Sequence, residues 1–341
     1  MRRAFTLVEM IIVVVIIGLL ALIAVPVYMT ALSQSKEHRT RAIVAKIDQI
    51  VGEKWEGYRT RQVPIKVPAG MSPQNAAAFR LNAIRELMRF ELPDRVSDVA
   101  NGPNYPPNTS PPNSIIPDPL GSYPVYALAA LRDRPSVNKQ FLRYANQAHP
   151  PGPPPWAATG IDYWTTANEN AECLYLILAL TRDGDNKALD WFSPTEIGDV
   201  DDDGMKEVLD GWGNPIAFLR WPAGYRADVA PFPVTSQRRN DTGIITDPTT
   251  YPDPFDPFKL DYRWADADVT NDPIILRPLI WSAGSDKRHD ISVGGGFTYA
   301  STSPPNDPYV NNGAIGQPAD TDSDGILSHA DNITNHDLEA R

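Results

Sequence analysis

The chain begins with a long apolar run. No charged residue occurs between Met10 and Ser35, and Met10–Val25 is almost wholly aliphatic. About 20 apolar residues in a helix are enough to cross the hydrocarbon layer of a membrane, so this run predicts a transmembrane helix. Arg2 and Arg3 precede it, and positive charge is typical of the cytoplasmic side of a span. The bulk of the chain is therefore expected on the outer side of that membrane.

Beyond the apolar run, the pattern predicts that the same helix continues with one buried face. Apolar residues recur there at three- and four-residue spacing, with charged residues between them. The members of this stripe are Ile43, Ile47, Ile50, Val51, Trp55 and Tyr58. Pro64 and Pro68 should end the helix. The stripe is what a helix needs in order to rest on a folded head domain.

The rest of the chain predicts mixed elements. Further helices are expected, with proline-rich connectors between them, at Pro73–Glu91, Val125–Ala148 (interrupted at Pro135) and Trp164–Leu180. Strand-like patterns come late, at Pro215–Trp221 and Ile274–Trp281. We therefore predict an α+β fold: a long N-terminal transmembrane helix that continues into a head with a small antiparallel sheet and a large helical, proline-rich insertion.

An acidic side chain lies in the first turn of the predicted membrane helix. Such a group costs roughly 2.5–3.5 kcal/mol on insertion scales, so it usually has a specific partner. Glu9 ends the run Ala4–Glu9, which reads Ala-Phe-Thr-Leu-Val-Glu. A secretory signal has its small-residue cleavage site after the apolar stretch, whereas here the small residue precedes it. This segment and the apolar run resemble the processing site of type IV pilins and type II secretion pseudopilins.

The resemblance implies a maturation step and a polymer contact. In that family a membrane peptidase cuts before the Phe and methylates its new amino group, so cleavage would fall between Ala4 and Phe5. Glu9 would then pair with the amino terminus of a neighbouring subunit, and Pro26 matches the family's helix-kinking proline. The family prefers Gly before the cut, where this chain has Ala4. The alternative is a plain signal anchor without processing.

With this resemblance, the chain divides into five segments. They are a leader at 1–4, a transmembrane and polymerisation helix at 5–29, its amphipathic continuation at 30–62, the insertion at 63–190, and a C-terminal sheet region with acidic loops at 191–341.

The net charge of the chain is −11. This balance argues against a nucleic-acid backbone as partner and is compatible with divalent cations. Cys173 is the only cysteine, so no intrachain disulfide can form.

Two acidic segments resemble calcium-binding loops. In the first, side-chain oxygens at alternate positions precede a Gly that permits a tight turn, and further acids follow. Its expected ligands are Asp199, Asp201, Asp203, Met205 through its backbone carbonyl, Glu207 and Asp210. The spacing recurs in a second segment, with Asp320, Asp322, Asp324 and Asp331. The alternative is that both segments are solvated acidic turns.

Two further segments resemble the major pseudopilin of type II secretion. Asp210–Ile216 is similar to its Asp-Pro-Trp-Gly-Asn-Pro-Tyr segment, and Trp281–Asp286 to its Ser-Leu-Gly-Ala-Asp-Gly segment. Ala330–Ile333 corresponds to an Ala-Asp-Ile near that protein's end. The resemblance implies that Asp286, Asp331 and the acids of the second loop surround a structural calcium ion.

These observations favour a structural subunit over an enzyme. The expected function is polymerisation in a type II secretion pseudopilus that drives protein export, with calcium stabilising the head. The expected partners are other pilin-like subunits, a prepilin peptidase, the inner-membrane secretion platform and membrane lipid, with the head in the periplasm before assembly. One alternative is a pilus or minor pilin for adhesion or uptake. Another is a membrane-tethered enzyme or glycan-binding protein that uses a pilin-type leader.

Overall fold

The structure is a computed structural model, and its description covers the ranges that follow. They are residues 7–63, 65, 67, 69–100, 135–148, 164–225, 252–265, 272–294, 308–309, 315–320 and 331–338. The helices are α1 (Leu7–Gly57), α2 (Pro73–Glu91), α3 (Val96–Ala100), α5 (Ser136–Ala148), α6 (Glu169–Leu180) and α7 (Asn335–Leu338). The strands are β1 (Arg182–Asp183), β2 (Asn186–Lys187), β3 (Ile197–Gly198), β4 (Glu207–Val208), β5 (Ile216–Leu219), β6 (Leu279–Ser282) and β7 (Ile333–Thr334).

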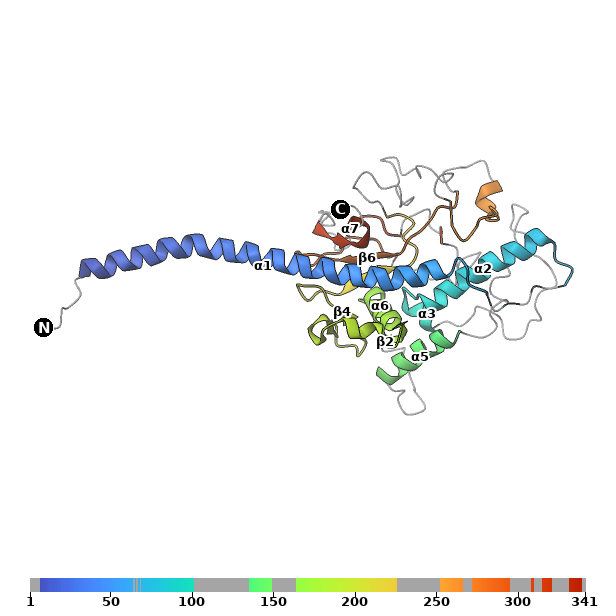
Figure 1. Cartoon of the computed structure of the whole chain (residues 1–341), viewed down its shortest axis with the longest axis horizontal. Coiled ribbons are helices and arrows are strands. Elements are labelled where there is room, and N and C mark those ends of the chain that lie inside the picture. Colours follow the sequence, from blue (N-terminus) through green and yellow to red (C-terminus); the bar gives the residue numbers. More distant parts are fainter. Residues whose placement is uncertain are drawn as a thin grey trace.

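One helix of 51 residues, α1, organises the molecule. Its N-terminal half projects away from the head, and its C-terminal half lies within it (Figure 1). All six residues of the predicted stripe are buried in the head core. The helix passes through Pro26, and the hydroxyl of Thr30 donates to the Pro26 carbonyl over 3.0 Å. The predicted two-part character of this helix is confirmed.

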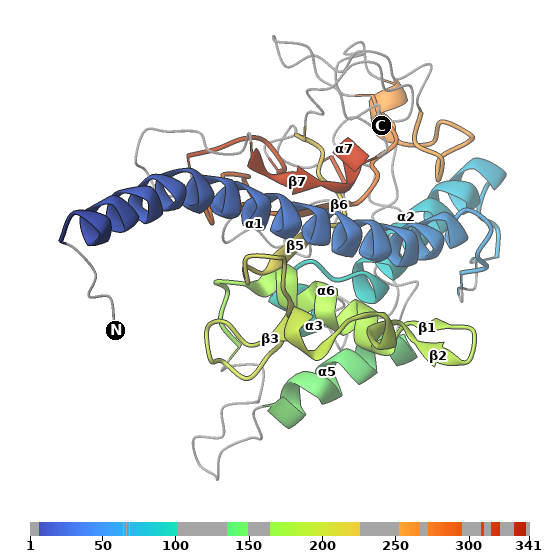
Figure 2. The same ribbon diagram turned by 60° about the vertical axis from the view of Figure 1, so that its left-hand side comes forward.

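A three-stranded antiparallel sheet, in the order β5-β6-β7, packs along α1. The register pairs Ile216 with Ser282 on the β5–β6 side and Trp281 with Thr334 on the β6–β7 side. Helix α1 contacts β6, β7 and α7, while α6 contacts β4 and β5. Figure 2 shows β7 and α7 on one side of α1 and α6 on the other side. The α+β fold with a small antiparallel sheet on the first helix is therefore confirmed.

Some element boundaries differ from the prediction for local reasons. Helix α6 begins at Glu169 rather than Trp164. The indole N–H of Trp164 donates to Glu172 of α6, and the backbone N–H of Thr165 donates to Asp203 of the acidic loop. Strand β6 begins at Leu279, directly after Pro278, which has no N–H to give to a ladder. Helix α2 has the predicted bounds. Of the helix expected at Val125–Ala148, the part before residue 135 lies outside the described residues.

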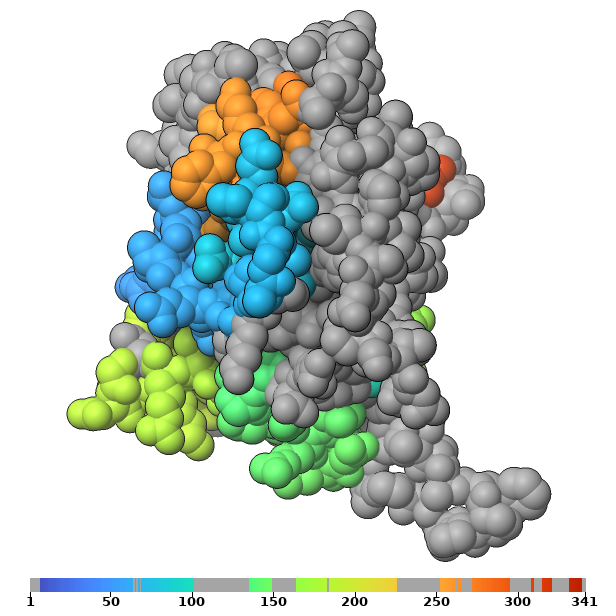
Figure 3. All heavy atoms as spheres, turned by 90° about the vertical axis from the view of Figure 1, so that its right-hand side faces the viewer, coloured from blue at the N-terminus to red at the C-terminus, as the bar shows by residue number. Residues whose placement is uncertain are grey.

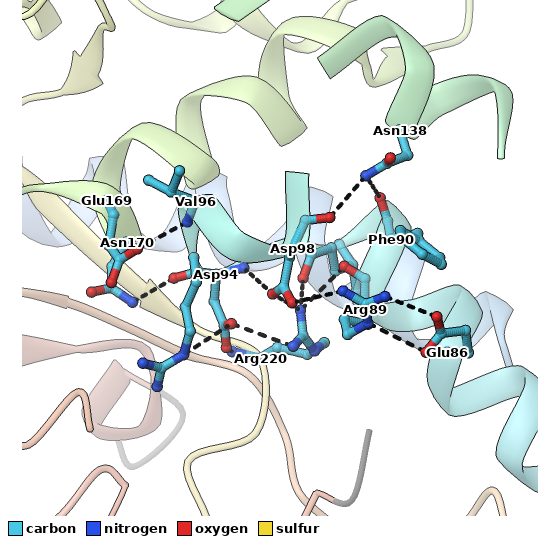
Figure 4. Close-up of polar contacts among 12 residues, drawn as sticks. Glu86, Arg89, Phe90, Asp94, Val96, Asp98, Asn138, Glu169, Asn170 and Arg220 are labelled. Carbon is cyan, nitrogen blue, oxygen red and sulfur yellow. Dashed lines mark hydrogen bonds and ion pairs between the residues drawn. The ribbon is translucent and has the colours of Figure 1, made fainter. Parts of the chain in front are cut away.

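A buried ion-pair network joins the insertion to the sheet (Figure 4). Asp98 of α3 accepts from Arg89 of α2 over 3.3 Å and from Arg220, which follows β5, over 3.1 Å. Arg89 also pairs with Glu86 over 2.8 Å, and Arg220 with Asp94 over 3.3 Å. The side chains of all five residues are fully buried. Opposite charges therefore stand in contact across three separate chain segments.

The network also shifts the proton affinities of its carboxylates. Burial by itself favours a protonated acid, but the guanidinium groups of Arg220 and Arg89 overcome it and hold the pKa of Asp98 below its usual range. Burial raises the pKa of Asp94 to about 6, with Arg220 opposing the rise. Asp98 is thus the ionised centre that both arginines need.

A second set of ion pairs fastens the 252–265 segment to α2. Arg85 pairs with Asp253 over 3.0 Å and with Asp261 over 2.7 Å, and all three side chains are buried. Figure 3 shows this segment, in orange, lying beside α2, in light blue. The insertion helix therefore binds the C-terminal half of the chain at two separate places.

We predict that Asp98→Asn destabilises the protein by about 3–5 kcal/mol, because it leaves two buried guanidinium groups without their shared charge. Urea unfolding of the full chain in detergent micelles, followed by tryptophan fluorescence, measures this loss. Glu56→Ala is the matched control, since Glu56 forms an exposed pair with Arg59, and it should cost under about 1 kcal/mol. Equal losses in both variants would contradict the assigned role of Asp98.

Candidate assembly helix and cation-binding loop

The first acidic segment connects two paired strands. Strands β3 and β4 are antiparallel, with Gly198 opposite Glu207, and the acidic residues lie in the connection between them. Asp202 and Gly204 adopt positive φ angles of 57° and 88°. Gly204 therefore provides the tight turn that the sequence predicted, because a residue without Cβ adopts this conformation readily. The hairpin turns its carboxylates toward one another.

The carboxylates form two compact groups that share one member. Asp199, Asp201 and Glu207 each offer an oxygen within 4.8 Å of the others, and Asp201 and Asp203 do so together with Glu172 of α6. Glu172 and Glu207 are fully buried. In the part of the chain that the structure describes, no basic side chain forms a salt bridge with any of the five. A hard cation prefers such an all-oxygen set of donors.

Hydrogen bonds hold one oxygen of Asp199, Asp201, Glu207 and Glu172 and leave the other oxygen of each residue open. Gly204 N–H donates to Asp199 Oδ2 over 3.0 Å, and Val200 N–H donates to Glu207 Oε2 over 3.1 Å. Four buried oxygens have no hydrogen-bond partner among the described residues: Asp199 Oδ1, Asp201 Oδ1, Glu207 Oε1 and Glu172 Oε1. Buried oxygens without partners are costly, so these residues fit a bound cation.

The contacts also show what holds the second group in place. Thr165 donates from its N–H to Asp203 over 2.7 Å and from its hydroxyl to Asp201 over 2.8 Å. The indole N–H of Trp164 donates to Glu172 Oε2. Asp203 Oδ1 accepts from the N–H of Met205 over 2.9 Å. The backbone carbonyl of Met205 as a ligand stays a prediction.

Crowded burial raises the proton affinity of both glutamates. Burial raises the pKa of Glu172 to about 9; the Trp164 hydrogen bond opposes the rise, and the charges of Asp203 and Asp201 add to it. Burial likewise raises the pKa of Glu207 to about 8. These carboxylates repel one another when ionised, and a bound cation would remove that repulsion.

Asp210 has a different role from the one its spacing suggested. Its Oδ1 accepts from the backbone N–H groups of Trp212 over 2.7 Å and Asn214 over 2.9 Å. Its Oδ2 accepts from the Ser282 hydroxyl over 2.6 Å. Asp210 belongs to neither carboxylate group among the described residues. The shorter Asp at the last loop position instead shapes the turn before β5 and ties it to β6.

That turn also rests on α1. Gly211 N–H donates to the Thr40 hydroxyl over 2.9 Å, and a Cβ at Gly211 would lie only 2.4 Å from the Lys36 carbonyl oxygen. The turn therefore contacts α1 at the beginning of its buried portion, and only glycine permits so close an approach.

The second predicted calcium loop is only partly described. Asp331 Oδ2 accepts from the N–H groups of Ser285 over 3.1 Å and Asp286 over 3.4 Å, so Asp286 and Asp331 lie side by side. Asp320 lies at the end of the described segment 315–320. Asp322 and Asp324 fall outside the described residues, so the ligand set of this loop stays a prediction.

The N-terminal half of α1 is the second candidate site. Large apolar side chains are exposed along it from Leu7 to Met29, and none of its most apolar 18-residue window is buried. Its length and composition suffice to cross a membrane. Glu9 lies in its first turn, on an exposed part of the helix. Ala4 and Phe5, the expected cleavage point, lie outside the described residues.

Comparison with known families identifies this end of the chain. Residues 1–25 match the family model of the prokaryotic N-terminal methylation motif. The match covers the leader, Glu9 and the apolar run that forms the exposed half of α1. This motif and the long apolar helix that contains it fit a type IV pilin-like protein. Searches of curated proteins and of solved structures each returned no match.

The pilin-like motif implies how this protein is processed and with what it assembles. It implies processing by a prepilin peptidase and assembly with other pilin-like subunits, and the apolar helix is that of a membrane-anchored pilin. The exposed apolar residues of α1 are then a surface kept for lipid and for neighbouring subunits. Among the described residues, the most apolar part of α1 is not packed against the head.

Sequence reasoning missed Glu172 as a member of the acidic site. It lies in the predicted helix Trp164–Leu180, about 30 residues before the loop, and its neighbours are apolar. The available signal was an acidic residue within an otherwise apolar, buried helix, because such a residue needs a partner. Only the packing of α6 against β4 brings it to the hairpin.

Proposed function

We propose that this pilin-like chain is a subunit of a type II secretion pseudopilus, in which α1 polymerises and calcium braces the head. The observation that carries the proposal is the combination of a prepilin-type N terminus with an α1 whose first half is wholly exposed and apolar. Subunits would leave the inner membrane one at a time and extend a short fibre that pushes proteins outward. The head would stand in the periplasm.

The contact between Glu9 and a neighbour's amino terminus would set the register of the fibre. A carboxylate and an ammonium group are each costly alone in lipid, while their attraction grows as the dielectric constant falls. A subunit that enters from the membrane would therefore be held where both charges meet. Lateral packing of aliphatic side chains along α1 would add the remaining affinity.

The choice of a pseudopilus over a pilus rests on two chain segments. Asp210–Ile216 and Trp281–Asp286 are the segments that resemble the major pseudopilin, although they lie far apart in the sequence. In the fold they touch: the Ser282 hydroxyl donates to Asp210, and the Asn214 amide donates to the Gly284 carbonyl over 3.0 Å. Their joint packing supports a shared head architecture.

Calcium at the β3–β4 hairpin would stabilise this head. The residues that would hold it are Asp199, Asp201 and Glu207, which form one compact group, with the Met205 carbonyl as a further donor. The open, buried oxygens of three of these residues support the assignment. A bound dication would offset the mutual repulsion of the carboxylates and keep the hairpin in one conformation.

We predict that the mature protein begins at a methylated Phe5. Mass spectrometry of the N-terminal peptide, from cells that carry a prepilin peptidase, measures this. A chain that keeps Met1, or one cut beyond Pro26, would contradict the pilin-type maturation. The same cells without the peptidase are the control and should yield only the uncut form.

We predict that Glu9→Gln lowers the yield of sheared filaments at least roughly tenfold, since losing about 1.4 kcal/mol of pairing per contact gives that factor. The assay needs cells that express a type II secretion assembly system, with membrane levels of the subunit measured in parallel. Glu53→Gln is the matched control, because Glu53 is an exposed acid of α1 within the head. Normal assembly of the Glu9 variant would contradict the proposal that Glu9 sets the register of the fibre.

We predict that calcium raises the melting temperature of the full chain in detergent, by an amount equivalent to roughly 1–3 kcal/mol at 10–100 times Kd. Asp201→Ala should lose the larger part of this shift, and Asp322→Ala tests the second loop separately. Asp185→Ala removes an exposed acid from the β1–β2 turn and should change nothing. Absence of any calcium effect in the wild type means that both loops are acidic turns.

A further inference from the structure

The acidic cluster at the β3–β4 hairpin is larger than one cation can satisfy. A calcium ion binds its oxygens at 2.3–2.6 Å, so its ligand atoms lie within about 5 Å of one another. The two groups that share Asp201 each meet this condition at 4.8 Å, but the five carboxylates do not form one such group in the described chain. Glu172 in particular is not grouped with Asp199 and Glu207.

Each group has its own open, buried oxygen. Glu207 Oε1 and Asp199 Oδ1 are open in the first group, and Glu172 Oε1 is open in the second. Glu172 is fully buried, and its other oxygen is already held by the Trp164 indole. The free oxygen therefore has no water-exposed alternative, and the second group calls for a ligand of its own.

Charge leads to the same conclusion. Five carboxylates carry up to five negative charges, and no basic side chain pairs with them among the residues that the structure describes. One dication leaves three charges uncompensated in a largely buried cluster, whereas two leave one. A carboxylate shared by two cations is also a recurring arrangement, with ions about 3.5–4 Å apart in two-metal sites. Asp201 holds that shared position here.

We propose that Glu172, Asp201 and Asp203 form a second position for a hard divalent cation, adjacent to the position formed by Asp199, Asp201 and Glu207. This inference rests on the proposed calcium binding of the hairpin and adds Glu172 to it. Because Glu172 lies on α6, the second cation ties a helix of the insertion to the hairpin. Helix α6 also contacts β5, so the tie extends to the sheet.

The test is calorimetric titration of the full chain in detergent with calcium chloride. All titrations use an Asp322→Ala background, which removes any calcium bound by the second loop. In this background, the otherwise unchanged chain should bind two calcium ions at the hairpin. Glu172→Gln should reduce the hairpin stoichiometry from two to one. Gln matches the shape of a protonated Glu, so the variant keeps the hydrogen bond from Trp164 and is expected to fold.

Two further variants complete the design. Glu169→Gln is the matched control on the same helix, because Glu169 accepts from Val96 N–H over 2.9 Å and belongs to neither acidic group; it should retain two ions. Asp203→Asn tests the second position from the hairpin side and should also bind one ion. Far-UV circular dichroism without calcium establishes that each variant is folded.

The outcomes separate this inference from the proposed function. The wild type could bind one ion, with binding unchanged in Glu172→Gln and abolished in Glu207→Gln. That result overturns the proposal of a second cation position and agrees with a single calcium ion that stabilises the head. Two ions retained in Glu172→Gln also overturn it. No binding in the wild type removes both cation positions, while filament assembly through Glu9 remains a separate question.

Discussion

The packing of the second half of α1 against the sheet is the contact on which the rest of the structure depends. The stripe from Ile43 to Tyr58 is buried against β6, β7 and α7, and the turn at Gly211 approaches the backbone of α1 at Lys36. Because a helix is a rigid rod, burial of one half fixes the direction of the other. The apolar half is thereby held clear of the head, free to meet lipid or the same helix of a neighbouring subunit.

Buried charge is handled in two different ways in the head. Around Asp98, acids and guanidinium groups from α2, α3 and the end of β5 neutralise one another within the protein. At the β3–β4 hairpin, acids gather without basic partners in the described chain, and open oxygens remain. The first arrangement is complete within the chain. In the proposed function, an external cation would complete the second arrangement, and the stability of the hairpin would then depend on that cation.

Both charge clusters lie where helices of the insertion meet strands of the head. Asp94 and Asp98 of the insertion form ion pairs with Arg220, which follows β5. Glu172 of the insertion lies in one carboxylate group with acids of the hairpin. The described helices of the insertion are therefore packed into the head. Loss of the insertion would remove the ion pairs of Arg220 with Asp94 and Asp98.

The sequence by itself determined what depends on local pattern. Periodicity alone placed the stripe of α1, the bounds of α2 and the two main strands, and the run from Ala4 to Glu9 indicated the maturation motif. Tertiary structure decided which distant residues meet. It assigned Asp210 to a turn and brought Glu172 to the hairpin from another helix. Spacing cannot specify such contacts, because they follow from how helices and strands pack and not from their order along the chain.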